Sequence, residues 1–507
     1  MGDNEFMAKY FRRRQFILGP RSVDYPHWQY LRLSNGYYLA AHPDLPVHSL
    51  TSRGHELILL GYWVDPYEPE LNNQDILNRL ENSSTSVKSI INFIEHLTGR
   101  FVLIFRNKEY FFLLHDACGL RNLVYGKDSS GKVWCASQPK LLAEQFSSEL
   151  DGEMLDFLNL SVFQKGQLDF YFPYQKTIYK NIYCLLSNHL LDLNSGDTRR
   201  FWPDRNKIPE NKIEDVIPQV ARLLTGSLQA AARRLNLKIG LSAGLDSRIT
   251  LAACKALTKH VTFFTHTPLN HNFFDEEIPK RLANRLKLNY DYCEIIPINP
   301  EFKNILSLNN ALCVLRRGTI AFSFLQKFGP KATLVNSNLY EFSRMLFWIP
   351  DFLVSGKTLA IMSSLDHPLA RSMFKKWLDE ATPSLLLSKI HPTVLFELEN
   401  ISRWVAEAYL DFDFAHETFN PFNNRLLIRL VNSVNPGLRR GNFNHFDYKL
   451  IDYLWPEVLS EPINPAPTLI GKAKREMARL INKNISPHFP LLELIRFLKY
   501  CLIYKFY

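Results

Sequence analysis

The spacing of apolar and polar positions changes character along the chain near residue 213. Before about residue 148, short apolar runs alternate with turn residues, and one helical stretch, 86–97, interrupts them. After residue 213, strand-like and helix-like segments alternate with each other. The first pattern predicts a domain of short strands, and the second predicts a doubly wound parallel sheet. Strands are expected in the first part at 37–41, 57–63, 101–105 and 110–115.

The second part begins with a long helical pattern, 216–235, and ends in a mostly helical region beyond Pro350. Between them, strands are expected at 237–241, 260–267, 290–296 and 332–337, and helices at 246–257 and 275–286. In such a sheet, ligands bind at the carboxyl ends of the strands.

The stretch Ser242-Ala243-Gly244-Leu245-Asp246-Ser247 falls at one of these ends, between the strand 237–241 and the helix that follows it. Small residues at a helix N-terminus offer backbone N–H groups and hydroxyls to an anion, above all phosphate. Asp246 fits such a turn if a divalent cation bridges its carboxylate to the phosphates. The alternative is an ordinary turn between a strand and a helix, in which Gly and Ser are common.

This loop resembles the Ser-Gly-Gly-x-Asp-Ser pyrophosphate loop of the asparagine synthetase family, with Ala243 where that family usually has Gly. The segments 97–142 and 177–202 resemble the second half of the family's glutaminase domain. The resemblance implies an α/β plus α+β protein in which an Ntn-type glutaminase-like β-sandwich (1–205) precedes a doubly wound PP-loop domain (206–465), an adenine nucleotide α-hydrolase-like fold with a helical C-terminal half. A basic, apolar tail (466–507) would follow.

The resemblance also assigns candidate site residues. ATP and its pyrophosphate are expected at Leu241, Ser242, Ala243, Gly244, Leu245, Asp246, Ser247 and Thr267, and Mg²⁺ at Asp246 and Glu341. Arg344, three residues after Glu341, is expected to reach a substrate carboxylate or a phosphate, or to pair with Glu341.

The basic residues Lys449, Lys472, Lys474 and Arg475 are candidates to stabilise charge in the transition state, and we favour Lys472 or Lys474. Asp275-Glu276 matches a position common in the family, but acids in a first helical turn are ordinary.

The chemistry of the family's glutaminase is missing from the first domain. Those enzymes use an N-terminal cysteine, whereas residue 2 here is Gly and no cysteine occurs before Cys118. No glutaminase nucleophile is therefore assigned, and the Asn-Gly pair of the family is absent, with Gly61-Tyr62-Trp63 near its place.

The composition limits the kinds of partner that the protein is expected to bind. The net charge of +10 accompanies no obvious RNA-binding motif, so small anionic substrates are favoured over nucleic acid. The seven scattered cysteines form no Cys-x-x-Cys pair, and no apolar run spans a membrane, so a cytoplasmic setting is expected. The tail 490–507 is apolar, aromatic and basic; peripheral contact with a membrane is one reading of it, and docking onto the protein is the other.

Together these features predict an ATP-dependent ligase that adenylates a carboxylate, releases pyrophosphate, and passes the acyl group to ammonia or an amine, without glutamine hydrolysis. β-Lactam synthetases and lasso-peptide cyclases resemble this architecture, so a peptide substrate also fits. The alternatives are asparagine synthesis from aspartate and a non-catalytic scaffold that retains the fold. A tRNA-modifying enzyme would be expected to carry paired cysteines or an RNA-binding module, and neither is seen.

Overall fold

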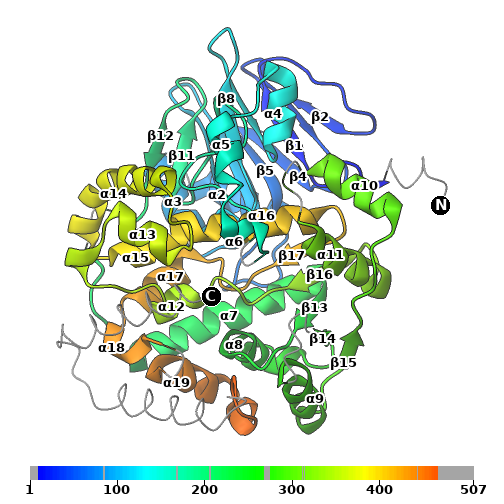
Figure 1. Cartoon of the computed structure of the whole chain (residues 1–507), viewed down its shortest axis with the longest axis vertical. Helices are drawn as coiled ribbons and strands as arrows, with labels where there is room; N and C mark the ends of the chain where they lie inside the picture. Colours follow the sequence, from blue (N-terminus) through cyan, green and yellow to red (C-terminus); the bar gives the residue numbers. More distant parts are fainter. Residues whose placement is uncertain are drawn as a thin grey trace.

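The computed structural model of the chain describes residues 9–83, 86–166, 169–204, 207–267, 274–310, 312, 314–441 and 444–465. Strands of the first 200 residues form two antiparallel six-stranded sheets, drawn in blue to cyan and green in Figure 1. The first has the order β10-β8-β9-β1-β3-β2, with β1 (Phe16–Gly19), β2 (Gln29–Arg32), β3 (Tyr38–Ala41), β8 (Val124–Lys127), β9 (Val133–Ala136) and β10 (Ile182–Cys184). The second has the order β12-β11-β7-β6-β5-β4, with β4 (Val47–Ser52), β5 (His55–Val64), β6 (Thr98–Arg106), β7 (Phe111–His115), β11 (His189–Asp192) and β12 (Thr198–Arg200).

The two sheets pack face to face, because apolar side chains of both, such as Leu18 and Ile104, share one core. Helices α2 (Asn73–Ser83) and α3 (Val87–Ile94) cover the outer face of the second sheet, and α4 (Pro139–Phe146) covers that of the first. The expected β-sandwich is thus confirmed as a helix–sheet–sheet–helix arrangement, while its assignment as glutaminase-like stays a prediction. Short helices α5 (Gly152–Phe157) and α6 (Ser161–Gln164) follow.

The second half contains the expected parallel sheet, with the order β15-β14-β13-β16-β17. Its strands are β13 (Asn236–Gly240), β14 (Thr262–His266), β15 (Tyr290–Cys293), β16 (Ala332–Val335) and β17 (Glu417–Phe419). Helices α7 (Ile213–Arg234) and α8 (Leu245–Ala253) pack on one face, and α11 (Leu315–Phe328) packs on the other. The sheet is therefore doubly wound, as the alternating pattern predicts.

Strand order reverses beside β13, because β14 and β15 extend the sheet on one side and β16 and β17 on the other. This is the topological switch point at which open α/β sheets bind ligands. The loop 242–247 leaves the carboxyl end of β13 at this point. The fold thus puts the loop singled out from the sequence at the position where a ligand is expected.

The C-terminal region is helical, with the exception of β17, which the sequence pattern did not predict. The three residues of β17 form an edge strand between two helical segments, too short to show a period of two. The remaining elements are η1 (Lys255–Leu257), α9 (Phe274–Leu286), α10 (Pro300–Asn309), α12 (Glu341–Arg344), η2 (Asp351–Leu353), α13 (Gly356–Met362), α14 (Pro368–Ser388), α15 (Pro392–Phe396), η3 (Glu397–Ile401), α16 (Ser402–Asp413), α17 (Arg425–Asn432), α18 (Pro436–Arg439), α19 (His445–Leu454) and η4 (Pro456–Ser460).

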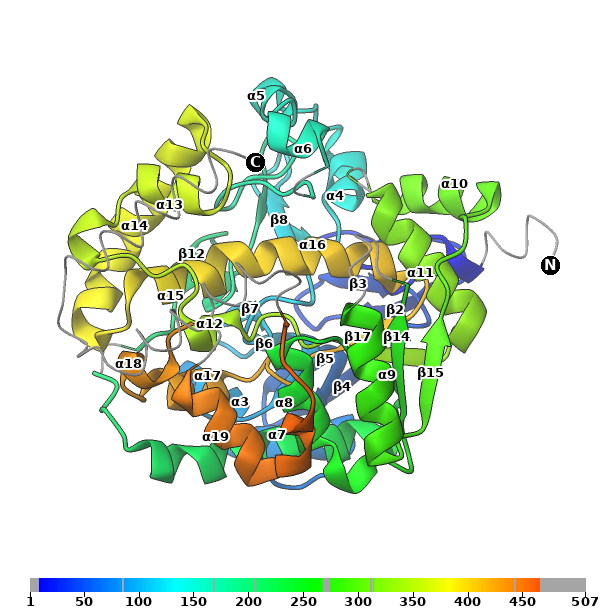
Figure 2. The ribbon, with the colours of Figure 1, turned by 60° about the horizontal axis from the view of Figure 1, so that its bottom comes forward.

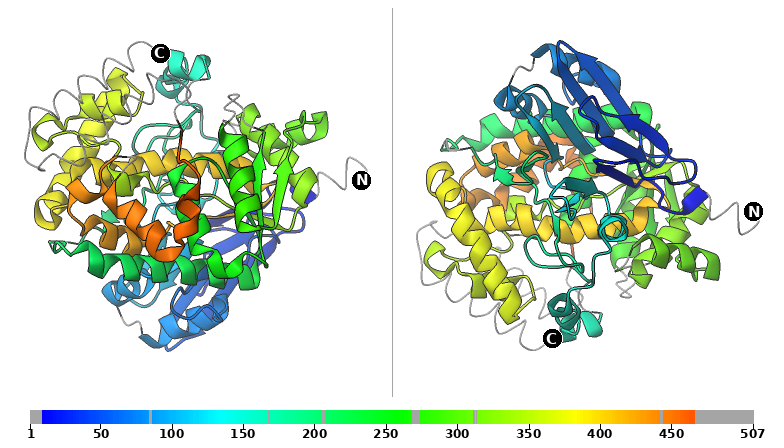
Figure 3. Two further views of the ribbon diagram at one scale, coloured as in Figure 1. Left: turned by 90° about the horizontal axis from the view of Figure 1, so that it is seen from below. Right: turned by 90° about the horizontal axis from the view of Figure 1, so that it is seen from above.

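The long helix α16 crosses the middle of the molecule, between the N-terminal strands and the helices of the second half (Figure 2). Seen from above, the blue N-terminal sheets lie over one side, and the yellow helices α13–α15 lie at the other (Figure 3). No helix in the described part of the chain is long and apolar enough to cross a membrane.

A buried charge network joins the two halves. Arg100 of β6 lies 2.7 Å from an Asp413 carboxylate oxygen and 2.5 Å from Glu417 of β17, and Arg121 lies 2.8 Å from Glu417. Burial opposes ionisation of Glu417, but these arginines and Arg14 outweigh it and hold its pKa well below the usual range. Buried pairs of this kind tolerate the removal of one partner poorly, so the network fixes how the two halves meet.

Two asparagines reinforce the same junction. Asn423 donates to the Gly99 carbonyl at 2.6 Å and to the Asp116 carboxylate at 2.9 Å, and its own oxygen accepts the Cys118 N–H at 2.9 Å. Asn424 caps α17 by accepting the Leu427 N–H at 2.9 Å. The Asn424 amide also donates to the Thr98 hydroxyl of β6 at 2.9 Å, so both asparagines serve the contact between the halves.

Candidate functional site

The loop 242–247 is short because β13 ends at Gly240 and α8 begins at Leu245. The Leu241 N–H continues the sheet by donating to the Phe264 carbonyl at 2.8 Å, and the Thr265 hydroxyl donates to the Leu241 carbonyl at 2.9 Å. Strand β14 thus anchors the loop at its start. The residues that follow are free of the sheet's hydrogen bonding and turn directly into the helix.

Two serine hydroxyls brace the loop from inside. The Ser247 hydroxyl accepts the Ser242 N–H at 3.2 Å and lies 3.0 Å from the Ser242 hydroxyl. The Ser242 hydroxyl in turn accepts the Gly244 N–H at 3.1 Å. The loop and its two serine hydroxyls, here called the cradle, are therefore fixed in shape by their own hydrogen bonds. That the cradle binds an anion stays a prediction.

The substitution of Ala for Gly at position 243 is compatible with this geometry. Ala243 is buried and is not among the residues with positive φ, and Gly244 has φ −77° and ψ 163°, which any residue adopts. A Cβ atom on Gly244 would lie 3.1 Å from the Ser242 hydroxyl, so a side chain there would need a small shift of that hydroxyl, and the constraint is close approach rather than backbone conformation.

The N-terminus of α8 opens toward the cradle. Gly244 is its N-cap residue, and no side chain in the described part of the chain caps the helix there. The first N–H groups of a helix carry a partial positive charge and bind anions. One anion already lies close, since the Asp275 carboxylate accepts the Ala243 N–H at 3.1 Å. Asp275 is in the first turn of α9, as expected, but it also contacts the loop, which the sequence reading discounted.

Asp246 of α8 pairs with Arg344 of α12 across the site. An Arg344 Nη atom lies 2.8 Å from Asp246 Oδ2, while Asp246 Oδ1 is buried without a hydrogen-bond partner in the described part of the chain. Burial raises the pKa of Asp246, Arg344 opposes this, and the carboxylates Glu341 and Asp447 add to the rise. Keeping Asp246 ionised in this site therefore costs free energy, and a bound cation would reduce that cost.

Glu341 and Glu397 lie at the edge of a cavity of about 130 Å³ on the far side of α12. Its walls are mostly apolar and include Phe342, Leu398 and Trp404. Burial and the neighbouring Glu341 raise the pKa of Glu397 well above its usual range. Glu397 opens the π-helical segment η3, a type of distortion that is frequent at functional sites.

A segment near the end of the described chain, residues 456–465, closes over the loop. The buried Arg248 of α8 donates to the carbonyls of Val458 at 2.7 Å, Glu461 at 3.1 Å and Pro462 at 3.0 Å. The Asn464 N–H donates to the Ala243 carbonyl at 2.8 Å. Both contacts fix the 456–465 segment against the helix and the loop that the sequence singled out.

The structure brings most of the predicted site residues together, but not all. Thr267 lies at the carboxyl end of β14, where its hydroxyl accepts from Tyr292 at 3.2 Å, so the expected adenine contact stays a prediction. Lys449 of α19 pairs with Glu214 at 2.6 Å, and its role as a transition-state cation stays a prediction. Lys472, Lys474 and Arg475, and the tail 490–507, lie outside the described residues.

Four neighbours of the loop were missed by sequence reasoning: Arg248, Asp447, Glu397 and Asn464. Asp447 accepts the Tyr340 hydroxyl at 2.8 Å, and burial raises its pKa. Of the four, only Arg248 carried a signal in the sequence, since it follows Ser247 directly, at the start of a helix that is otherwise mostly apolar after it. The others arrive from distant segments that no local pattern connects.

The donor set fits a magnesium ion. The orphaned Asp246 Oδ1 and the nearby Glu341 supply carboxylate oxygens. No group of three potential metal ligands occurs among the described residues. Mg²⁺ is commonly held by one or two carboxylates together with phosphate oxygens and water, and this site offers that combination when nucleotide is present.

No family model matches the sequence, and no curated protein matches it. Among solved structures, an NH3-dependent NAD synthetase from Campylobacter jejuni is 18% identical over 39% of this chain and 96% of its own, with a TM-score of 0.22. An NMN synthetase from Francisella tularensis is 14% identical over 40% and 96%, with a TM-score of 0.20. A glutamine phosphoribosylpyrophosphate amidotransferase from B. subtilis is 10% identical over 52% and 61%, with a TM-score of 0.23. Scores of this size do not establish a shared fold, so the function has to be argued from the site itself.

Proposed function

We propose that the protein is an ATP-dependent ligase that adenylates a carboxylate, releases pyrophosphate, and transfers the acyl group to ammonia or to an amine. The observation that supports this proposal best is the loop 242–247, a tight turn braced by its own serines at the switch point of a parallel sheet. Its Asp246 has a buried oxygen without a partner among the described residues. An anion cradle beside an orphaned carboxylate suits a nucleotide phosphate bound together with a divalent cation.

Each group of the loop would have a distinct role. The Ser242 and Ser247 hydroxyls and the first N–H groups of α8 would hold the pyrophosphate of ATP. Asp246 and Glu341 would hold Mg²⁺, which supplies charge neutralisation at the phosphates when bound. Arg344 lies beside Asp246 and is the cation best placed, among the described residues, to contact a phosphate or the carboxylate that is activated.

The cavity beside α12 is the candidate pocket for the acyl substrate. It adjoins Glu341 and is also lined by Glu397. Burial and the neighbouring Glu341 raise the pKa of Glu397 and so favour its protonated form, which would donate a hydrogen bond to a substrate oxygen. Mostly apolar walls with a few convergent polar groups are typical of small-molecule pockets. A volume of about 130 Å³ suits a small acid or the reacting end of a larger one.

Ammonia released from glutamine by a cysteine nucleophile is not expected to feed this site. The five described cysteines, 118, 135, 184, 254 and 293, are all buried, and burial raises the pKa of each. A cysteine nucleophile needs access and a lowered pKa. The nitrogen donor would therefore be free ammonia or a second substrate that carries an amine.

Two alternatives share the same loop. Asparagine synthesis from aspartate would require the small cavity to take a dicarboxylic amino acid beside two glutamates. A non-catalytic scaffold would keep the cradle without binding magnesium nucleotide. The charged neighbours of Asp246 favour an active site over a scaffold, because a carboxylate held at a cost is typical of functional positions.

The test is a reaction with ATP, Mg²⁺ and a panel of acids, aspartate among them, in which AMP, ADP and pyrophosphate are measured. We expect AMP and pyrophosphate from the wild type and at most about a hundredth of that rate from Asp246→Asn. The matched control is Asp452→Asn, an exposed aspartate of α19, and its rate should be unchanged. Release of ADP would overturn adenylation, and equal ATP binding by the wild type and Asp246→Asn, with and without Mg²⁺, would support the scaffold.

A further inference from the structure

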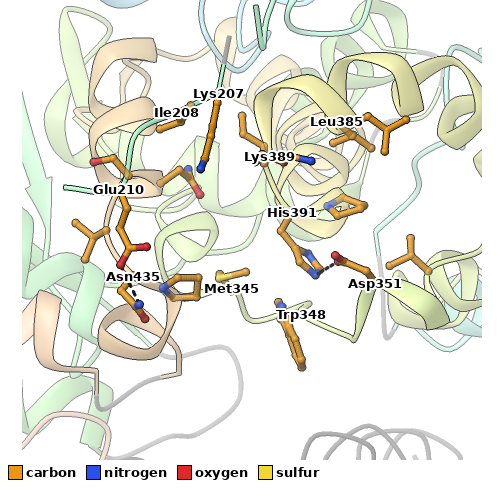
Figure 4. A pocket seen from close by; sticks show the side chains of 18 of the residues that line it. Lys207, Ile208, Glu210, Met345, Trp348, Asp351, Leu385, Lys389, His391 and Asn435 are labelled. Atoms are coloured by element: carbon orange, nitrogen blue, oxygen red, sulfur yellow. Dashed lines mark hydrogen bonds and ion pairs between the residues drawn. The ribbon is translucent and has the colours of Figure 1, made fainter. Parts of the chain in front are cut away.

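A groove of about 580 Å³ lies on the side of α12 away from the parallel sheet. Residues 345–351 after α12, the C-terminal end of α14 with its link to α15, and the start of α18 form its walls. Residues 207–210, between the two halves of the chain, close it on the remaining side (Figure 4). A volume of this size is in the range of pockets for small-molecule ligands.

The charged groups of the groove leave an excess of positive charge. Its two carboxylates are engaged, since Asp351 pairs with His391 at 2.8 Å and Glu210 accepts the Asn435 amide at 3.0 Å. Lys207 and Lys389, by contrast, form no ion pair with any described residue, and both are exposed. In Figure 4 both lysines extend along the upper part of the groove, away from Trp348 at the bottom.

The opposite wall is apolar and rigid. Trp348 is held between the Arg440 guanidinium, 3.9 Å from its ring centroid, and the His391 ring at 5.6 Å. Met345 and Leu385 continue this surface, and Leu386 at the rim is 64% exposed. An apolar wall facing free cations is complementary to a ligand with an apolar body and an anionic group.

The groove adjoins the segment that carries Arg344. The buried Arg439 lines the groove and donates to the carbonyls of Phe342 at 3.4 Å and Ser343 at 3.1 Å. Met345, which lines the groove, directly follows Arg344 in the chain. A ligand in the groove would therefore rest against the same short helix whose arginine pairs with Asp246.

We propose that this groove is a binding site for an amphipathic carboxylate, with its apolar body on Trp348 and Met345 and its carboxylate between Lys207 and Lys389. The site is distinct from the cradle at 242–247, and the inference does not depend on the chemistry proposed there. Because the lysines lie away from α12, the bound carboxylate is not the one that the loop would activate. The ligand is either a second substrate that carries an acid or a regulator of α12.

The test is isothermal titration of the full chain with N-acetyl-L-phenylalanine and, as its matched neutral partner, N-acetyl-L-phenylalaninamide. We expect the acid to bind about tenfold more tightly than the amide, because only the acid can pair with both lysines. The double substitution Lys207→Met and Lys389→Met should weaken the acid about tenfold and leave the amide unchanged. Lys303→Met with Lys331→Met, two exposed lysines on other elements, is the control and should bind both probes as the wild type does.

Three results would overturn the proposal: equal affinity for acid and amide, no effect of the double lysine substitution, and no saturable binding of the acid. None of them bears on the adenylation reaction, which is measured with a different readout. Conversely, loss of AMP formation in Asp246→Asn would leave the titration unaffected, so the two proposals fail separately.

Discussion

Replacing Asp246 with asparagine should stabilise the protein while it abolishes magnesium-dependent nucleotide binding. The substitution keeps the shape of the side chain and removes one negative charge from a site that also contains Glu341, Asp447 and Glu397. Arg344 loses one ion-pair partner but is still attracted by the carboxylates of Glu341 and Asp447. The carboxylate is 19% exposed, so solvent relieves only part of this repulsion.

The raised pKa of Asp246 gives the sign of the effect. A carboxyl group whose pKa is higher in the folded than in the unfolded state binds protons more readily when folded, so stability falls as the pH rises above its unfolded pKa. Each pKa unit corresponds to about 1.4 kcal/mol, and the raised pKa of Asp246 already includes the opposing attraction of Arg344. We expect a net gain of about 1 to 3 kcal/mol in the free energy of unfolding at pH 7.5 for Asp246→Asn.

Chemical denaturation of the wild type, Asp246→Asn and the control Asp452→Asn at several pH values measures this gain. The difference between the wild type and Asp246→Asn should be smallest near pH 4 and should grow toward pH 8, while the control follows the wild type. In parallel, titration with ATP and Mg²⁺ should show binding to the wild type and the control only. A loss of stability in Asp246→Asn at pH 7.5 would refute the reasoning, since it would mean that the pair with Arg344 outweighs the repulsion.

Three further substitutions test the surroundings of the site. Arg248→Met removes the three hydrogen bonds to the 456–465 segment and should lower the free energy of unfolding by about 3 kcal/mol. Hydrogen exchange should become faster only in that segment and in α8, and unchanged exchange would contradict the anchoring role. Glu417→Gln leaves Arg100 and Arg121 short of a buried counter-charge and should cost about 3 to 5 kcal/mol in denaturant unfolding, whereas a cost below 1 kcal/mol would show that Asp413 suffices. Burial lowers the pKa of His416 to about 3, so unfolding becomes linked to proton uptake by this side chain below pH 6.5. The wild type should therefore lose about 2 kcal/mol in the free energy of unfolding between pH 6.5 and pH 5, and His416→Phe should lose correspondingly less. Equal losses in the two proteins would exclude His416 as the titrating group.

The cradle itself was predictable because its parts are contiguous. Residues 237–253 form a strand, a turn and a helix, and the serine hydrogen bonds that brace the turn lie within the segment, so a short stretch of sequence predicts its conformation. The alternation of strands and helices likewise predicts a parallel sheet, because a right-handed crossover of that length leaves little other choice. The expected strand ends differ from the observed ones by a few residues, because hydrogen bonding at the end of a strand depends on the adjacent strands of the sheet.

The groups around the cradle could not be predicted in the same way. Arg344 is 98 positions from Asp246 and Asp275 is 32 from Ala243, so their contacts depend on how the chain returns to the sheet. The sequence suggested that Arg344 either pairs with Glu341 or reaches a substrate, whereas the fold points its guanidinium at Asp246. The ion pair between Lys449 and Glu214 is likewise decided by the fold, since the two residues are 235 positions apart.

By itself, then, the sequence determined the local elements and the tight turn at 242–247, because each depends on neighbouring residues alone. The tertiary structure decided which charges share a site: the carboxylates around Arg344, the arginines around Glu417, and the unpaired lysines of the Trp348 groove. Electrostatic energies depend on the distance between charges in space and on their burial, and neither quantity can be read from the sequence. The loop fixes what kind of ligand the protein can hold, and the fold fixes the charges that surround it.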